Sequence, residues 1–217
     1  MIEAILFDLD GTLLDTIVDI AESANFALSS LGYPPHATEK YKHFVGNGVD
    51  VLVRRILPEG ARTAENEEAV KRIYLTRYGE HSLDTTGPYD GIVDLLGELA
   101  LAGKKLAVVS NKPDNTAKST VSYFFGSDRF DSVIGASPDA PLKPDPTMAA
   151  CAMAHLKVQP QGVVFVGDTS VDIQTGKNAG CHTVGVTWGF RNREELEESG
   201  AEHVIDAPHE LLDILRL

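Results

Sequence analysis

Residues 5–15 of the chain read ILFDLDGTLLD. The apolar run at 5–7 is typical of a buried strand, and it is followed at once by two aspartates, Asp8 and Asp10, with one leucine between them. Like charges this close repel each other, so each needs a positive partner to stay ionised, or one must carry a proton. The stretch therefore predicts either a cation or a protonated carboxyl group at the end of the first strand.

Composition limits the class of protein and its partners. The 217 residues suit one domain with a large insertion, or two small domains. The formal net charge of −13 disfavours nucleic acid as a partner, because binding to its phosphates needs a basic face. The two cysteines are too few for a disulfide framework, and no apolar run approaches the length of a membrane span, about 18 residues. Without a leader sequence either, we expect a cytoplasmic protein with no membrane partner, either a monomer or a homodimer.

The remaining pattern alternates between strands and helices. Short apolar runs predict strands at residues 3–7, 105–110, 131–134, 162–166, 183–186 and 203–205. Helical patterns lie between them at residues 90–101, 115–125, 146–156, 171–179 and 209–215. Most strand runs are apolar throughout, which is typical of strands covered on both faces. We therefore predict an α/β fold, a doubly wound parallel sheet with a Rossmann-like core.

Residues 16–83 interrupt this alternation. They contain helical patterns at residues 16–31, 39–45, 49–57 and 64–78, and no strand pattern. The sequence thus predicts two domains: an α/β core made of residues 1–15 and 84–217, and an inserted all-helical domain made of residues 16–83.

Polar residues gather where the predicted strands end, and ligands of open parallel sheets bind beyond those carboxyl ends. In chain order, these residues are Asp8, Asp10, Ser110, Asn111, Lys112, Lys143, Asp168 and Asp172. If the loops converge, one crevice holds three or four carboxylates, one ammonium group and one hydroxyl group. Oxygen ligands without a neighbouring histidine or cysteine select a hard cation, so the predicted cofactor is Mg²⁺.

This set of groups is suited to phosphoryl transfer. An aspartate beside Mg²⁺ can attack a phosphoryl group and form an aspartyl phosphate. The metal, the Lys143 ammonium and the Ser110 hydroxyl would stabilise charge on the transferring oxygens. A second, protonated aspartate can donate to the leaving group and then deprotonate water. Gly11 would let backbone amides approach the phosphate closely.

Taken together, these motifs resemble those of the haloacid dehalogenase superfamily, specifically its phosphatases. Residues 8–12 (DLDGT) match the first motif of that family, Ser110 the second, Lys143 the third and residues 167–172 (GDTSVD) the fourth. All four occur in the family's order and span nearly the whole chain, and the helical insertion resembles the family's cap domain.

The resemblance also implies a role for each matching residue. Asp8 would be the nucleophile and Asp10 the general acid and base. The metal would be held by Asp8, by the backbone carbonyl of Asp10 and by Asp168, with Asp172 acting through water or through Lys143. Dehalogenases lack an acid two residues after the nucleophile, so Asp10 favours phosphatase chemistry.

The insertion carries the signal for the substrate. Residues 44–50 read FVGNGVD, and two glycines flanking an asparagine allow backbone amides at a helix start to face an anion. With the following VLVRR, the segment resembles that of phosphoglycolate phosphatases. Only one of two adjacent helical arginines can face a site. The candidate substrate-binding residues are Gly11, Thr12, Asn111, Lys112, Gly46, Asn47, Gly48, and either Arg54 or Arg55.

We therefore expect Mg²⁺-dependent hydrolysis of a small phosphorylated metabolite, 2-phosphoglycolate. The alternatives in the same superfamily are a sugar phosphatase, a pyrophosphatase and a β-phosphoglucomutase-like enzyme, the last disfavoured by the acidic Asp50. A non-catalytic binding protein on this fold is the alternative from a different class. Trp188 and Phe190, which follow a predicted strand, are interpreted as packing residues.

Overall fold

The computed structural model describes residues 2–216 and divides into two compact units. The α/β unit comprises the chain up to Leu14 and from Pro88 onward, and the helical unit comprises Asp15–Gly87. Where the chain passes from one unit to the other, β2 (Leu14–Asp15) and β3 (Gly87–Pro88) pair as a two-stranded sheet. Strands of two residues are too short to show a sequence period, and they were not predicted.

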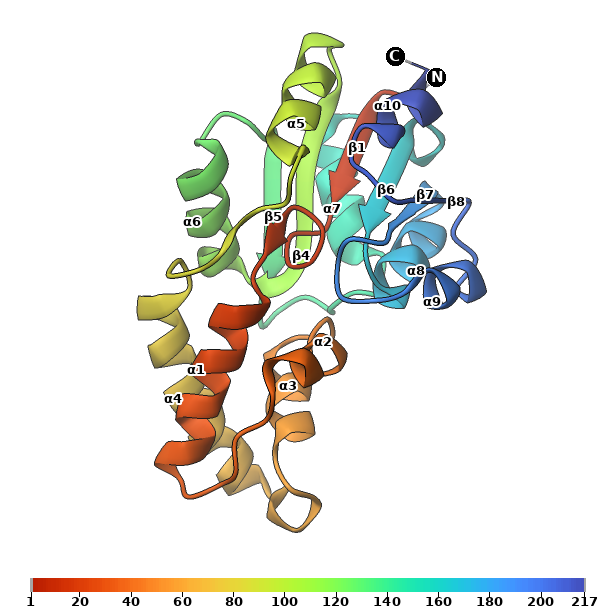
Figure 1. Ribbon diagram of the computed structural model, residues 1–217. Helices are drawn as coiled ribbons and strands as arrows, with labels where there is room; N and C mark the ends of the chain where they lie inside the picture. The colour runs from red at the N-terminus through yellow and green to blue at the C-terminus, as the bar shows by residue number, and fades with distance from the viewer. Residues whose placement is uncertain (1, 217) are drawn as a thin grey trace. The chain divides into compact units, whose positions relative to one another are not determined.

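Within residues 2–216, six strands form one parallel sheet in the order β5-β4-β1-β6-β7-β8 (Figure 1). Their bounds are β1 (Ala4–Phe7), β4 (Lys105–Pro113), β5 (Ser132–Ala136), β6 (Val163–Gly167), β7 (His182–Val186) and β8 (His203–Ile205). The helices of this unit are α5 (Ile92–Leu101), α6 (Asp114–Phe125), α7 (Thr147–Leu156), α8 (Ser170–Ala179), α9 (Arg193–Glu198) and α10 (Glu210–Leu215). The predicted parallel α/β fold with a helical insertion is confirmed.

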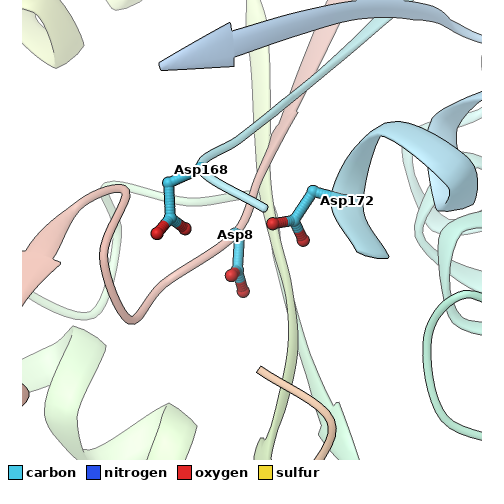
Figure 2. A group of neighbouring side chains, drawn as sticks. All are labelled: Asp8, Asp168 and Asp172. Atoms are coloured by element: carbon cyan, nitrogen blue, oxygen red, sulfur yellow. The ribbon is translucent and has the colours of Figure 1, made fainter. Parts of the chain in front are cut away.

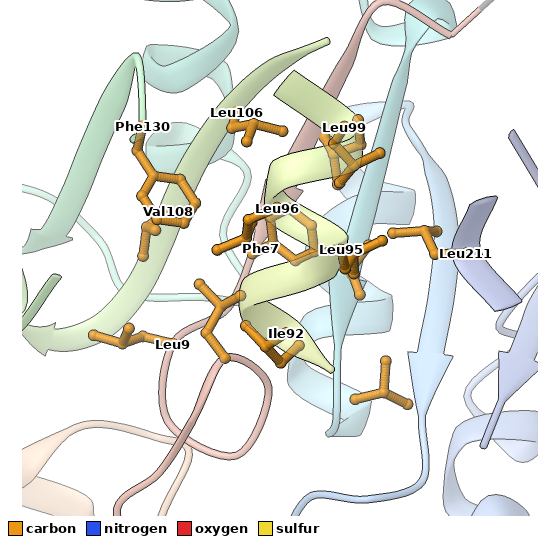
Figure 3. Close-up of a cluster of buried hydrophobic side chains, with 14 of the residues drawn as sticks. Phe7, Leu9, Ile92, Leu95, Leu96, Leu99, Leu106, Val108, Phe130 and Leu211 are labelled. Carbon is orange, nitrogen blue, oxygen red and sulfur yellow. The ribbon is translucent and has the colours of Figure 1, made fainter. Parts of the chain in front are cut away.

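The position of β1 explains its uniformly apolar sequence. The strand lies between β4 and β6, and all four of its residues are buried. Ile5 and Phe7 join a cluster with the leucines of α5 on one face of the sheet (Figure 3). Ala4 and Leu6 join a second cluster with α7 on the other face. Alternate side chains of a strand point to opposite faces, so a strand covered on both sides is apolar at every position.

The helical unit contains α1 (Ile17–Ser30), α2 (Thr38–Phe44), α3 (Val49–Ile56) and α4 (Ala64–His81), with a 3₁₀ turn at Glu59–Ala61. Asp19 of α1 is 2% exposed and accepts hydrogen bonds of 2.6–3.1 Å from the backbone and hydroxyl groups of Thr85 and Thr86. Burial raises the pKa of Asp19, but these hydrogen bonds outweigh it and lower the pKa below the ordinary value. A buried carboxylate thus holds the end of the unit's chain against its first helix.

The end of β4 differs from the prediction. The strand continues three residues beyond residue 110, and its register with β5 shifts between Val109 and Pro113. The strand therefore includes Asn111 and Lys112 as well as Ser110, rather than leaving them in a loop after it. No helix among residues 2–216 has the length and apolar character needed to cross a membrane.

Candidate active site

Three buried carboxyl groups meet at the carboxyl edge of the sheet. Asp8 follows β1, Asp168 follows β6, and Asp172 lies in the first turn of α8. Phe7 is in register with Val166, so the ends of β1 and β6 coincide. One oxygen of each carboxyl group lies within 4.8 Å of the other two, and Figure 2 shows the three side chains converging from these segments. The predicted convergence of the first and fourth motifs is present in the fold.

Lys143 supplies a positive charge to this cluster. It lies in the connection between β5 and α7, and its side chain is 1% exposed. Its Nζ lies 2.7 Å from Oδ1 of Asp8 and donates a hydrogen bond of 2.7 Å to Oδ1 of Asp172. Lys143 and Asp8 are at ion-pair distance, but the contact lacks the angles of a hydrogen bond. Oδ1 of Asp8 is therefore a buried oxygen that accepts no hydrogen bond.

Asn111 fixes the backbone that carries this lysine. Its side-chain nitrogen donates to the Lys143 carbonyl at 3.1 Å, and its Oδ1 accepts the Lys143 N–H at 2.8 Å. The sequence predicts Asn111 as a substrate-binding residue, and these contacts give it an additional, positioning role.

The electrostatics of the cluster favour the binding of a cation. Burial is the largest cause that raises the pKa of Asp8 to about 7, the Asp172 charge raises it further, and Lys143 opposes both. Burial, followed by the charges of Asp172 and Asp8, also raises the pKa of Asp168. Burial acts to lower the pKa of Lys143, but the two carboxylates outweigh it and raise that pKa. The single ammonium group of Lys143 therefore cannot balance the negative charge of three ionised carboxyl groups in this buried cluster.

These residues fit a divalent metal ion. The donor set is made of carboxylate oxygens, which hard cations such as Mg²⁺ prefer, and Asp8 Oδ1 is a buried oxygen with no hydrogen-bond donor. A cation here would offset the burial and the mutual repulsion that raise the pKa values of Asp8 and Asp168, and so would favour their ionised forms.

Asp172 also caps α8. Its Oδ2 accepts the Thr169 backbone N–H at 3.0 Å and the Thr169 hydroxyl at 2.7 Å, and the two residues form a reciprocal capping box. The side chain therefore serves the helix start with one oxygen and Lys143 with the other.

The turn after Asp8 is closed by its own hydrogen bonds. The backbone N–H of Gly11 donates to the Leu14 carbonyl and that of Thr12 to the Leu9 carbonyl. Gly11 has a φ of 90°, and an added Cβ would overlap the Asp168 carboxylate. Glycine at position 11 therefore allows the backbone to lie close to the Asp168 carboxylate.

Four other predicted residues of the α/β unit lie around the carboxylate cluster. The Thr12 hydroxyl donates to Asp168 Oδ1 at 3.1 Å. Lys112 Nζ donates to Asp10 Oδ1 at 2.8 Å, and Ser110 Oγ accepts the Lys112 N–H at 3.2 Å. All the predicted core positions thus gather at the carboxyl ends of β1, β4 and β6.

The remaining predicted residues lie in the helical unit, between α2 and the end of α3. Gly46 and Gly48 have φ angles of 107° and 85°, which favour glycine. Arg55 donates to the Phe44 carbonyl at 3.0 Å and approaches the His43 carbonyl at 3.4 Å, whereas Arg54 is exposed. Asn47 lies between the two glycines, and the ligand-binding role of all five residues stays a prediction.

Trp188 and Phe190, which follow β7, pack against the core as predicted, but their hydrogen bonds at the site were not predicted. The Phe190 backbone N–H donates to Asp168 Oδ2 at 2.7 Å, and Trp188 Nε1 donates to the Thr12 carbonyl at 3.0 Å. A backbone donor leaves no trace in side-chain chemistry. The available signal was Gly189, a glycine just beyond a strand at the ligand-binding edge of the sheet.

Known proteins are similar to this chain in sequence and in fold. A family profile described as haloacid dehalogenase-like hydrolase matches residues 5–186. A phosphoglycolate phosphatase from Pseudomonas putida is 34% identical over 212 residues, which cover 96% of this chain and 78% of that protein. An N-acetylmuramic acid 6-phosphate phosphatase from Pseudomonas aeruginosa is 32% identical, covering 99% of this chain and 95% of the relative.

Solved structures give the same result for the fold. The crystal structure of a predicted phosphoglycolate phosphatase from Haemophilus somnus superimposes with a TM-score of 0.92 at 29% identity, covering 99% of this chain and 98% of that one. The likeness extends over both units of the chain.

Proposed function

The chain belongs to the haloacid dehalogenase-like hydrolase family and is a phosphatase of the phosphoglycolate phosphatase type, and from this premise we propose that it hydrolyses 2-phosphoglycolate with the help of Mg²⁺. The observation that carries the chemistry is the position of Asp8. Its carboxyl group lies at the end of β1 among two other buried carboxyl groups and the Lys143 ammonium. A nucleophile that must meet an anionic phosphate needs this combination of a cation site and a fixed positive charge.

In the first half of the reaction, an Asp8 oxygen attacks phosphorus and the bond from phosphorus to the ester oxygen breaks. Asp10, as the acid, gives its proton to the departing alkoxide. Asp8 is thereby converted to an aspartyl phosphate. Lys143 holds Asp8 in place and balances charge on the phosphoryl oxygens, together with the Ser110 hydroxyl.

In the second half, the Asp10 carboxylate takes a proton from water, whose oxygen attacks phosphorus. The bond from phosphorus to Asp8 breaks, inorganic phosphate leaves, and Asp10 is protonated again for the next cycle. Asp8, Asp168 and the Asp10 carbonyl would hold Mg²⁺, with Asp172 acting through water or through Lys143, and the ion would supply positive charge that keeps Asp8 ionised and neutralises the phosphate.

A carboxylated substrate is supported by the residues outside the cluster. Lys112 carries a buried ammonium beside Asp10, where a second anionic group of a small substrate would lie. The Gly46–Asn47–Gly48 segment precedes α3 and would supply backbone amides from the helical unit, our proposed cap. Arg54 is exposed and is the arginine free of the loop-bracing contacts that Arg55 makes.

A second candidate substrate follows from the 32% identity to the N-acetylmuramic acid 6-phosphate phosphatase. That relative is named for a larger phosphorylated acid. Both candidates combine a phosphate monoester with an acid group, so the difference between them lies in size.

The test is phosphate release from 2-phosphoglycolate, N-acetylmuramic acid 6-phosphate, glucose 6-phosphate and pyrophosphate, with Mg²⁺ and with EDTA. We expect turnover only with the metal, and the highest kcat/KM for 2-phosphoglycolate. Acid-quenched single turnovers should trap phosphate on Asp8, and Asp8→Asn should be inactive. Wild-type turnover by Asp8→Asn would overturn the mechanism. Another substrate preferred by about tenfold, or about 1.4 kcal/mol, would overturn the substrate assignment alone.

A further inference from the structure

Both oxygens of Asp168 are held by hydrogen bonds from segments far apart in the sequence. Oδ1 accepts the Thr12 hydroxyl at 3.1 Å and Oδ2 accepts the Phe190 backbone N–H at 2.7 Å. Asp168 itself is fully buried. A carboxylate oxygen has two acceptor positions, so one on each oxygen remains after these bonds. The carboxyl plane is therefore fixed while capacity for a further ligand remains.

The two donor segments are also joined to each other. Trp188 Nε1 donates to the Thr12 carbonyl at 3.0 Å, and the partly buried indole packs against the apolar cluster around Phe7 and Leu95. The turn after β1 and the 188–190 segment after β7 thus form a clamp around one carboxylate.

Gly189 is required by the close approach within this clamp. A Cβ at this position would lie 2.5 Å from Asp168 Oδ2 and would overlap the Gly11 carbonyl oxygen and the Asp168 Cβ. The three neighbouring atoms belong to the backbone or to the buried Asp168 side chain, which accepts two hydrogen bonds. None of them can move aside easily. The absence of a side chain at Gly189 is therefore a condition for the observed position of Asp168.

We propose that residues 188–190 are positioning residues of the metal site, which set its affinity for the cation by fixing Asp168 without supplying a ligand. This inference rests on the metal site of the proposed function. Groups that orient a metal ligand through hydrogen bonds typically change metal affinity about 10- to 100-fold when they are removed. A clamp of this kind should therefore act on the dissociation constant for the metal rather than on the chemical step.

The test is binding of Mn²⁺, followed by the electron paramagnetic resonance signal of the free ion in the absence of substrate. We expect Gly189→Ala to raise the dissociation constant about 10- to 100-fold. Trp188→Phe keeps the ring and removes only the N–H donor, so we expect a smaller rise of a few fold. The matched control is Gly97→Ala in α5, where an added Cβ meets no atom within 4 Å, and it should bind Mn²⁺ like the wild type.

Activity provides a second readout. In both clamp variants the Mg²⁺ concentration for half-maximal activity should rise, while kcat at saturating Mg²⁺ changes little. If Gly189→Ala does not fold, as judged by circular dichroism, Trp188→Phe decides the question. Wild-type Mn²⁺ affinity in the folded variants overturns the clamp and leaves the proposed function intact. Conversely, a wild-type protein that binds Mn²⁺ but hydrolyses no phosphate ester overturns the proposed function and leaves the clamp to be judged by the binding data.

Discussion

The Lys112 ammonium lies 2.8 Å from Oδ1 of Asp10, in an ion pair whose lysine side chain is 3% exposed. The pair joins the end of β4 to the loop after β1. In the proposed function, this buried ammonium beside the acid and base also meets an anionic group of the substrate. We therefore predict separable effects for the two partners, one on substrate binding and one on proton transfer.

Replacement of Lys112 by methionine should weaken recognition of a substrate carboxylate. Hydrogen bonds to charged groups contribute about 1.5–3 kcal/mol, so kcat/KM for 2-phosphoglycolate should fall roughly 10- to 100-fold. Hydrolysis of p-nitrophenyl phosphate, which has no carboxylate, should fall much less. An equal loss for both substrates would show that Lys112 supports the catalytic groups and does not read the carboxylate.

Replacement of Asp10 by asparagine should separate proton transfer from metal binding. The proposed metal ligand is the backbone carbonyl, which the substitution keeps, whereas the acid and base is lost. We expect a decrease in kcat of roughly 10²–10⁴-fold at saturating Mg²⁺. Mn²⁺ affinity should stay near the wild-type value, and a collapse of affinity with normal kcat at high metal would contradict this role.

The pKa of Asp8 predicts how stability depends on pH and metal. Without metal, folding raises this pKa from 3.8 to about 7, so between these values the folded state holds a proton that the unfolded state lacks. The contribution of Asp8 to the free energy of unfolding should therefore fall as pH rises through this range. Mg²⁺ should replace the proton, so its stabilising effect should be larger at about pH 8 than at about pH 5.

Thermal unfolding in EDTA and in Mg²⁺ at both pH values measures this difference. Asp8→Asn, which cannot titrate at this position, should show a smaller dependence of Tm on pH in EDTA. A metal-induced rise in Tm that is the same at the two pH values would contradict the prediction.

The segment before α3 provides a prediction about the substrate. Valine at Gly46 and Gly48 is strained at the observed φ angles of 107° and 85°. The double variant should raise KM for 2-phosphoglycolate and largely spare p-nitrophenyl phosphate, because the latter needs little recognition by the helical unit. Gly60→Val in the same unit, where an added Cβ meets no atom within 4 Å, is the control.

The two arginines of α3 should behave differently. Arg55→Ala removes the hydrogen bond of 3.0 Å to the Phe44 carbonyl, so it should lower Tm and raise KM together. Arg54 is exposed, so Arg54→Ala should leave Tm unchanged and affect only KM. If Arg54→Ala alone lowered Tm, the division between bracing and substrate recognition would be wrong.

Much of the fold and of the carboxylate cluster could be predicted from the sequence. Runs of apolar residues in the sequence indicate strands, and parallel strands place their carboxyl ends at one edge of the sheet. Asp8 and Asp168 were therefore expected to lie close together. Lys143 lies in a long connection, and only its family motif indicated that it would reach Asp8. The contacts of Asn111 and Phe190 involve backbone groups, which every residue possesses, so residue type could not predict them.

The order of strands in the sheet has a consequence for how the chain folds during synthesis. Ala4 of β1 is paired with Lys105 on one side and with Val163 on the other. The ribosome therefore produces β1, then the whole helical unit, before either neighbouring strand exists, and pairings this distant in sequence form slowly. Throughout that interval the apolar Ile5, Leu6 and Phe7 remain uncovered, so the strand that precedes Asp8 is the segment of the nascent chain for which we expect chaperone protection to matter most.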